Sequence, residues 1–114
     1  MKIYHLKTCD TCRKAIKALK AAGHEPALTD VRANGVSARD LAQIEAAVGY
    51  EKLLNTRSTT WRGLEDSEKQ DIDAAKALDL MAQHPTLIKR PVISNDRQIT
   101  VGWTKEVQAQ WLGA

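Results

Sequence analysis

Residues 2–13, KIYHLKTCDTCR, join a short strand pattern to a Cys-x-x-Cys pair placed where a helix begins. Polar and apolar residues alternate over 2–6, as in a half-buried strand, and the two cysteines follow shortly after. A thiol in the first turn of a helix lies near the positive end of the helix dipole and near unpaired backbone N–H groups. Both favour the thiolate, which is the nucleophile in disulfide and oxyanion chemistry. The pattern predicts a thiol redox site in which Cys9 attacks and the more buried Cys12 resolves.

Two other interpretations of the cysteine pair remain. The thiols could be buried residues with no chemistry, or they could bind zinc. Zinc takes about four ligands, however, and the sequence has no second Cys-x-x-Cys. His5 belongs to the predicted strand and is not expected to converge with both sulfurs. No metal site is therefore expected.

The residues that follow predict a β-α-β unit. Apolar residues recur at helical spacing over 11–22, and Gly23 suits the position just after a helix. Residues 26–31 then return as a second strand. Two parallel strands joined by a helix require a right-handed crossover.

The middle of the sequence predicts helices. Ser37 and Asp40 resemble a capping box that opens a helix to Val48, and Gly49 ends it. Residues 50–54 add a short helical turn, and the run over 55–62 is polar. A second helical region is predicted over 66–83, closed by His84-Pro85. Its apolar face would consist of Ile72, Ala75, Leu78 and either Met81 or Ala82.

After residue 90 the hydrophobic period changes back to two. Residues 92–94 and 98–101 predict a hairpin around Asn95-Asp96, and Thr104 can cap a last helix to Leu112. The complete order is β-α-β, a helical insertion at about 35–85, then β-β-α. We expect an α/β fold in a single domain over 1–114.

Composition and charge limit the classes of function. The 114 residues are 43% hydrophobic and 27% charged, which suits one domain with its own core. No signal peptide and no membrane-length apolar run is present, so we expect a cytoplasmic protein with no membrane contact. In that compartment a lone Cys-x-x-Cys is more often redox-active or metal-binding than structural.

The net charge of +3 is mildly basic, and five dispersed aromatic residues give direct nucleic-acid binding no support. Three lysines recur along the first predicted helix, at positions 14, 17 and 20. They form either a solvated face or a field that attracts anionic substrates and lowers the pKa of the thiol.

Three segments of the sequence resemble the arsenate reductase ArsC/Spx family. They are CDTCRKA at 9–15, LNTRSTTWR at 54–62 and the segment HPTLIKRPVI at 84–93. The resemblance extends from Ile3 past Gly102. It implies a thioredoxin-like fold with a mixed four-stranded sheet and an inserted helical region.

The resemblance also implies roles for individual residues. Cys9 matches the nucleophile of the family, and Arg90 matches an arginine that binds the anion and holds the thiolate. Pro91 matches a proline that is cis opposite the thiol, where the neighbouring backbone can pair with a peptide or glutathione. Arg57 matches a second anion-binding arginine, or instead forms a salt bridge that pins its loop. An arginine fork binds oxyanions in a way that lysine cannot copy.

Two positions depart from the typical arsenate reductases. Gly102 stands nearest to their third arginine, and Cys12 occupies a position where they commonly lack cysteine. Arg13, beside Cys12, either supports the thiolate and helps to bind substrate or is a surface residue. The local sequences look closest to a branch of small thiol-dependent reductases.

We therefore expect a reductase with no bound cofactor that acts on a disulfide, a glutathione-mixed disulfide or an arsenate-like oxyanion. Electrons would come from glutathione and glutaredoxin, or from thioredoxin. The alternative is a redox-switched regulator of the Spx type that binds a subunit of RNA polymerase. Such regulators carry a longer C-terminal segment than the two residues after Leu112, which favours the enzyme.

Overall fold

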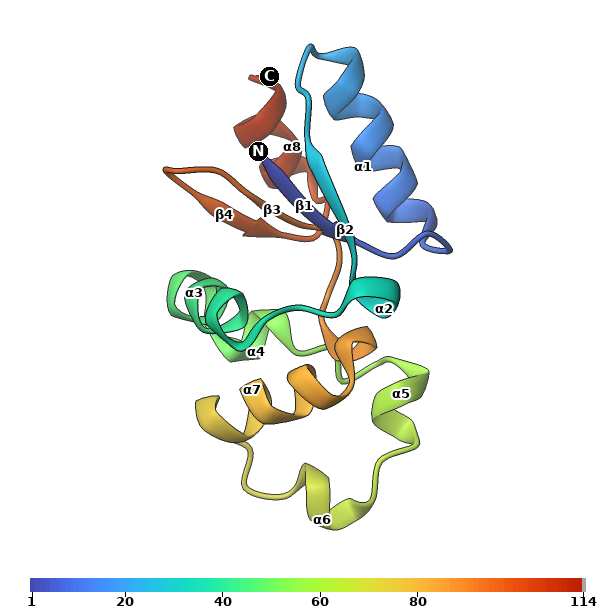
Figure 1. The fold of residues 1–114 in the computed structure, drawn as a ribbon, viewed down its shortest axis with the longest axis vertical. Helices are drawn as coiled ribbons and strands as arrows, with labels where there is room; N and C mark the ends of the chain where they lie inside the picture. The colour runs from blue at the N-terminus through green and yellow to red at the C-terminus, as the bar shows by residue number, and fades with distance from the viewer. Residues whose placement is uncertain (114) are drawn as a thin grey trace. The chain divides into compact units, whose positions relative to one another are not determined.

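The computed structural model describes residues 1–113 and divides into two compact units (Figure 1). The first unit combines residues 1–34 with the segment from Arg90 onward, and the second comprises Gly35–Lys89. The second unit corresponds to the predicted helical insertion, extended by four residues to Lys89. A single domain over 1–114 stays a prediction.

The first unit contains a mixed four-stranded sheet in the order β2-β1-β3-β4. The strands are β1 (Lys2–His5), β2 (Ala27–Asp30), β3 (Val92–Ser94) and β4 (Ile99–Val101). The central strand β1 pairs in parallel with β2 and antiparallel with β3, and β3 pairs antiparallel with β4. The predicted α/β fold and sheet are confirmed.

Two helices cover one face of this sheet (Figure 1). They are α1 (Asp10–Ala21) and α8 (Lys105–Leu112), which bring Leu19 and Trp111 against Ile3 and Ile93. The indole Nε1 of Trp111 donates to the hydroxyl of Thr100 at 2.7 Å, so the largest side chain of the core is also hydrogen-bonded. This packing fixes the axis of α1, whose first turn carries the thiols.

The second unit is helical. Its elements are α3 (Ala38–Val48), α4 (Tyr50–Leu53), α5 (Thr59–Arg62), α6 (Asp66–Lys69), α7 (Ala74–Gln83) and the 3-10 turn η1 (Pro85–Leu87). α3 and α7 pack together and contribute buried residues such as Leu41 and Leu80. An isolated antiparallel bridge between Leu54 and Ile88 joins the segment after α4 to the end of the unit.

The single helical region predicted over 66–83 is wrong, because it breaks between α6 and α7. Asp71 adopts a left-handed φ of 53°, and the carboxylate of Asp73 caps α7 by accepting from Lys76 N–H at 2.8 Å. The predicted apolar face is also partly wrong. Ala75 and Ala82 are exposed, and the buried residues of α7 are Ala77, Leu80 and Met81. The pattern failed because Ile72, from which the spacing was counted, lies outside the helix.

Two further elements were not predicted. The strand expected over 26–31 ends at Asp30, and the chain turns at once into α2 (Val31–Asn34). The polar run over 55–62 contains α5, capped by the hydroxyl of Ser58, which accepts from Trp61 N–H. The caps predicted at Ser37 and Thr104 are confirmed, each accepting a backbone N–H three residues on. Within residues 1–113, every helix is too short or too polar to cross a bilayer.

Candidate active site at the start of the first helix

Cys9 is the N-cap residue of α1, as the sequence predicts. Its backbone is extended (φ −92°, ψ 113°), its N–H donates to Leu6 C=O at 3.0 Å, and its own C=O accepts from Arg13 N–H at 3.1 Å. An N-cap side chain lies over the unpaired N–H groups of the first turn. The side chain of Cys9 is half-buried, whereas Cys12 is fully buried. The outer thiol is therefore the accessible one.

The surroundings of Cys9 favour its thiolate. Partial burial raises the pKa of the Cys9 thiol, but several groups acting together outweigh this effect and lower it from its ordinary value of 9.0. These groups are the N–H and thiol of Cys12, the charge of Arg90 and the N–H of Thr11. Neither N–H makes a full capping hydrogen bond to the sulfur, yet both lie close enough to stabilise its charge.

The surroundings of Cys12 favour its neutral thiol. Burial is the main cause and raises the pKa of Cys12 to about 12. The Leu6 backbone and the charge of Arg90 lower this pKa, whereas the hydrogen bond to Cys9 and the charge of that residue raise it further. The two pKa values are therefore separated, so that Cys9 loses its proton before Cys12 as the pH rises.

Arg90 lies close enough to the pair for its charge to act on it, and Pro91 follows it in the chain. The Arg90-Pro91 peptide bond is cis, which confirms the sequence prediction. The charge of Arg90 acts on both sulfurs, and its Nε atom is buried. The structure thus brings Cys9, Cys12 and Arg90 together.

Gly102 contacts this segment through its backbone. Its N–H donates to Pro91 C=O at 2.9 Å, and it has a φ of 85°, a conformation that side chains with a Cβ rarely adopt. Glycine is therefore suited to this backbone, and an arginine in its place would be strained.

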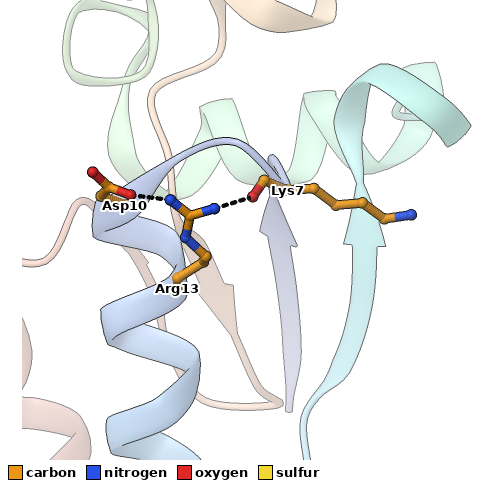
Figure 2. Close-up of polar contacts among 3 residues, drawn as sticks. All are labelled: Lys7, Asp10 and Arg13. Carbon is orange, nitrogen blue, oxygen red and sulfur yellow. Dashed lines mark hydrogen bonds and ion pairs between the residues drawn. The ribbon is translucent and has the colours of Figure 1, made fainter.

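Arg13 faces the backbone of the loop before the helix. Its guanidinium donates to Lys7 C=O at 3.1 Å and pairs with the carboxylate of Asp10 (Figure 2). Arg13 is exposed at the surface of α1, as one of the two interpretations predicted. Its hydrogen bond to Lys7 also supports the loop before the helix. A contact between Arg13 and substrate stays a prediction.

A cavity of about 380 Å³ lies beside the same loop. Its lining comes from the loop and from the β2–α2 junction and consists of Leu6, Lys7, Thr8, Asp30, Arg32 and Ala33. Figure 2 shows the Lys7 side chain extending away from Asp10 and Arg13. Two exposed cations, Lys7 and Arg32, thus line a cavity whose wall includes the residues just before Cys9.

Arg57 belongs to the second unit. It lies in the turn between α4 and α5, where its N–H donates to the Asn55 side chain at 3.1 Å and its C=O accepts from Arg62 at 3.1 Å. Its role in binding an anion stays a prediction. A separate cavity of about 260 Å³ in this unit is lined by Tyr50, Glu51, Leu54, Thr56, Trp61, Ile72 and Lys89.

Sequence reasoning missed Asp30. This residue is 7% exposed, and its carboxylate accepts three backbone N–H groups, one of them from Lys7 in the nucleophile's loop. Its place near the end of a predicted strand was no sufficient signal, because an exposed aspartate can occupy the same position. In residues 1–113 no three His, Cys, Asp or Glu side chains are grouped so as to hold a metal ion.

Comparison with known proteins identifies the family. Residues 4–110 match the sequence model of the ArsC family. A Haemophilus influenzae protein named only as uncharacterised is 43% identical over 94% of this chain and 95% of its own length. An arsenate reductase of Rhizobium meliloti is 32% identical over 80% of this chain and 66% of its own. A global transcriptional regulator Spx of Lactococcus lactis is 26% identical over 91% and 80%.

Solved structures agree with these sequences. A protein titled YffB superposes with a TM-score of 0.91, at 34% identity and 97% coverage of both chains. An ArsC-related protein of Brucella melitensis superposes with a TM-score of 0.74, at 33% identity, covering 99% of this chain and 94% of that one. With its thioredoxin-like architecture and a family match over 4–110, the chain belongs to the ArsC family.

Proposed function

We propose that this protein is a thiol reductase in which Cys9 attacks the sulfur of a disulfide or of a glutathione-mixed disulfide. The observation that carries the proposal is the difference between the pKa values of the two thiols. Cys9 has a lowered pKa at a helix N-terminus, and Cys12, within hydrogen-bond reach of it, has a pKa raised to about 12. A thiolate beside a protonated thiol is the arrangement that dithiol chemistry requires.

The first step forms one S–S bond and breaks another. The Cys9 thiolate attacks a substrate sulfur, and the other half of the disulfide leaves as a thiolate that takes a proton from water. Arg90 is positioned to offset the negative charge spread over the three sulfurs in the transition state, because its charge acts on both cysteines.

The second step uses Cys12. Once Cys9 is bound in the mixed disulfide, it no longer carries the charge and the hydrogen bond that raise the pKa of Cys12. The Leu6 backbone and Arg90, which lower that pKa, remain. The Cys12 thiol then loses its proton to the departing thiolate and attacks the Cys9 sulfur. The enzyme holds a Cys9–Cys12 disulfide, and two electrons from a pair of glutathione thiols, from glutaredoxin or from thioredoxin restore it.

The charge of the first unit suits an anionic substrate. Residues 1–34 and 90–114 contain ten Lys and Arg against five Asp and Glu, whereas residues 35–89 contain seven against nine. A net +5 on the part that carries the thiols attracts carboxylate-bearing molecules such as glutathione conjugates. Lys7 and Arg32 add two cations at the adjacent cavity. The thiol-reducing setting that this chemistry needs is that of the cytoplasm.

A turnover assay tests the proposal. A glutathione-mixed disulfide and arsenate are each offered with glutathione plus glutaredoxin, or with thioredoxin, and NADPH consumption is followed. We expect mixed-disulfide turnover that is lost in Cys9→Ser, with the thioredoxin-linked rate also lost in Cys12→Ser. Turnover that persists in Cys9→Ser would refute the proposal. Arsenate turnover that depends on Cys9 would extend the substrates to oxyanions.

A second candidate rests on the Cys-x-x-Cys pair and on relatives named as Spx regulators. In this alternative the oxidation state of Cys9 and Cys12 controls binding to a subunit of RNA polymerase. Pull-down of polymerase by reduced and by oxidised protein distinguishes the two. The alternative requires binding that changes with oxidation, whereas the reductase requires none.

A further inference from the structure

Asp30 is a buried carboxylate that the thiol chemistry described above does not use. It ends β2 and is 7% exposed. Burying a carboxylate is unfavourable unless hydrogen bonds compensate the lost hydration. The groups that compensate Asp30 therefore indicate what the residue does.

The carboxylate of Asp30 divides its hydrogen bonds between two segments. Oδ1 accepts from Arg32 N–H at 2.9 Å and from Ala33 N–H at 3.0 Å, and these bonds begin α2. Oδ2 accepts from Lys7 N–H at 3.1 Å, a residue 23 positions away. The Ala33 bond is the main cause that keeps the pKa of Asp30 below its ordinary range, and the Lys7 and Arg32 bonds add to it against the effect of burial. The group is therefore ionised at neutral pH.

The Lys7 bond fixes the loop that carries the nucleophile. Lys7 lies two residues before Cys9, and its backbone is bound on both sides. Asp30 accepts from its N–H, and Arg13 donates to its C=O (Figure 2). The preceding residue, Leu6, accepts from Cys9 N–H at 3.0 Å, and its backbone also bonds to the Cys12 sulfur. A displacement of Lys7 would therefore be transmitted to both thiols.

We propose that Asp30 is a positioning residue, whose bond to Lys7 N–H holds residues 6–8 so that Cys9 stays at the N-cap of α1. The inference rests on the proposed function only in taking Cys9 as the nucleophile. Asp30 acts through the backbone and touches no reacting atom. The role differs from general support of the fold because it predicts that loss of the Asp30 contact changes the pKa of Cys9.

Asp30→Asn separates positioning from simple electrostatics. Asparagine keeps one carbonyl oxygen, which can retain both bonds to α2, but its NH2 group would face Lys7 N–H, donor against donor. Removing a negative charge near a thiolate would by itself lower the pKa of Cys9. Losing the loop contact moves Cys9 from the helix N-terminus and raises that pKa. The two explanations therefore predict opposite signs.

The experiment measures the alkylation rate of Cys9 by iodoacetamide against pH, with peptide mass spectrometry, in the wild type, Asp30→Asn and Asp96→Asn. Asp96 is an exposed carboxylate of the β3–β4 turn in the same unit, so its variant removes the same charge without touching the loop. We expect the midpoint to rise only in Asp30→Asn, with alkylation at neutral pH slowed roughly threefold to tenfold. A midpoint that falls or stays unchanged in Asp30→Asn would overturn the inference.

A measurement on the wild type covers the case in which Asp30→Asn does not fold. Amide proton shifts of Lys7, Arg32 and Ala33 are followed by NMR as the pH is lowered through the titration of Asp30. We expect all three to move with one midpoint, below the ordinary aspartate range. A Lys7 amide that does not follow the other two would overturn the inference.

The alkylation and turnover assays test the positioning role and the proposed function independently. A wild type without reductase turnover, but with a raised Cys9 midpoint in Asp30→Asn, would remove the proposed function and leave the positioning role. Turnover in the wild type with an unchanged Cys9 midpoint in Asp30→Asn would remove the positioning role and leave the proposed function.

Discussion

The buried thiol of Cys12 predicts a specific loss of stability in alkali. Its pKa is about 12 in the folded protein, against an ordinary value of 9.0. Between these values the unfolded chain has released the proton that the folded chain retains, so the free energy of unfolding falls as the pH rises. The slope for one proton is about 1.4 kcal/mol per pH unit, and three units amount to about 4 kcal/mol. The stabilisation is complete below pH 9.0 and is lost toward pH 12.

Urea unfolding of the wild type and of Cys12→Ala, both kept reduced, measures this slope. Between about pH 9.5 and 10.5 the difference in unfolding free energy should move against the wild type by about 1.2 kcal/mol, because the unfolded thiol is still partly protonated at the lower pH. Cys9 does not interfere, because the stability from its lowered pKa rises with pH only up to 9.0 and is constant above it. Groups that the two proteins share cancel in the difference. Parallel pH dependences for the two proteins would refute the assignment of a protonated, buried Cys12.

Four further substitutions test the site, the core and the backbone. Arg90→Gln should slow alkylation of Cys9 at neutral pH by about threefold, because the charge of Arg90 lowers its pKa; an unchanged rate would exclude that contribution. Ile3→Ala should lower the unfolding free energy by about 3 kcal/mol, because Ile3 is fully buried. Leu28→Ala, which truncates a side chain that is 43% exposed, should change it by less than about 0.5 kcal/mol. Gly102→Ala should be destabilising by about 1 kcal/mol because of its φ of 85°, although its Cβ would contact nothing within 4 Å, and circular dichroism melting would detect it.

The sheet and its covering helices were predictable because their signals are local. The alternation over 2–6, the glycine after the first helix and the threonine before the last one each act on neighbouring residues. The position of Cys9 at the N-cap follows from the same local pattern, and the structure places it there. The cis Arg90-Pro91 bond was predicted from the family resemblance, since the sequence around it carries no local sign of its isomer.

The break between α6 and α7 was missed for a different reason. Charged residues over 65–73 satisfy helical propensity, but Asp73 competes for the backbone as a cap, and the residues before it leave the helix. A helical count begun at Ile72 then assigned the wrong face to α7. Spacing alone could not identify the residue from which the helix begins.

Asp30 was missed because its partner is distant in sequence. Its bond to Lys7 spans 23 residues and exists only once β1 and β2 are paired side by side. No local pattern distinguishes this aspartate from an exposed residue at a strand end. Contacts that form only when two strands pair can be identified only from the structure.

The pH dependence of Cys9 alkylation in the reduced wild type tests the central claim most directly. The rate constant for iodoacetamide, resolved from that of Cys12 by peptide mass spectrometry, reports the thiolate fraction of each sulfur. The account predicts a midpoint for Cys9 below 9.0 and a much later one for Cys12. A Cys9 midpoint at or above 9.0 would contradict it.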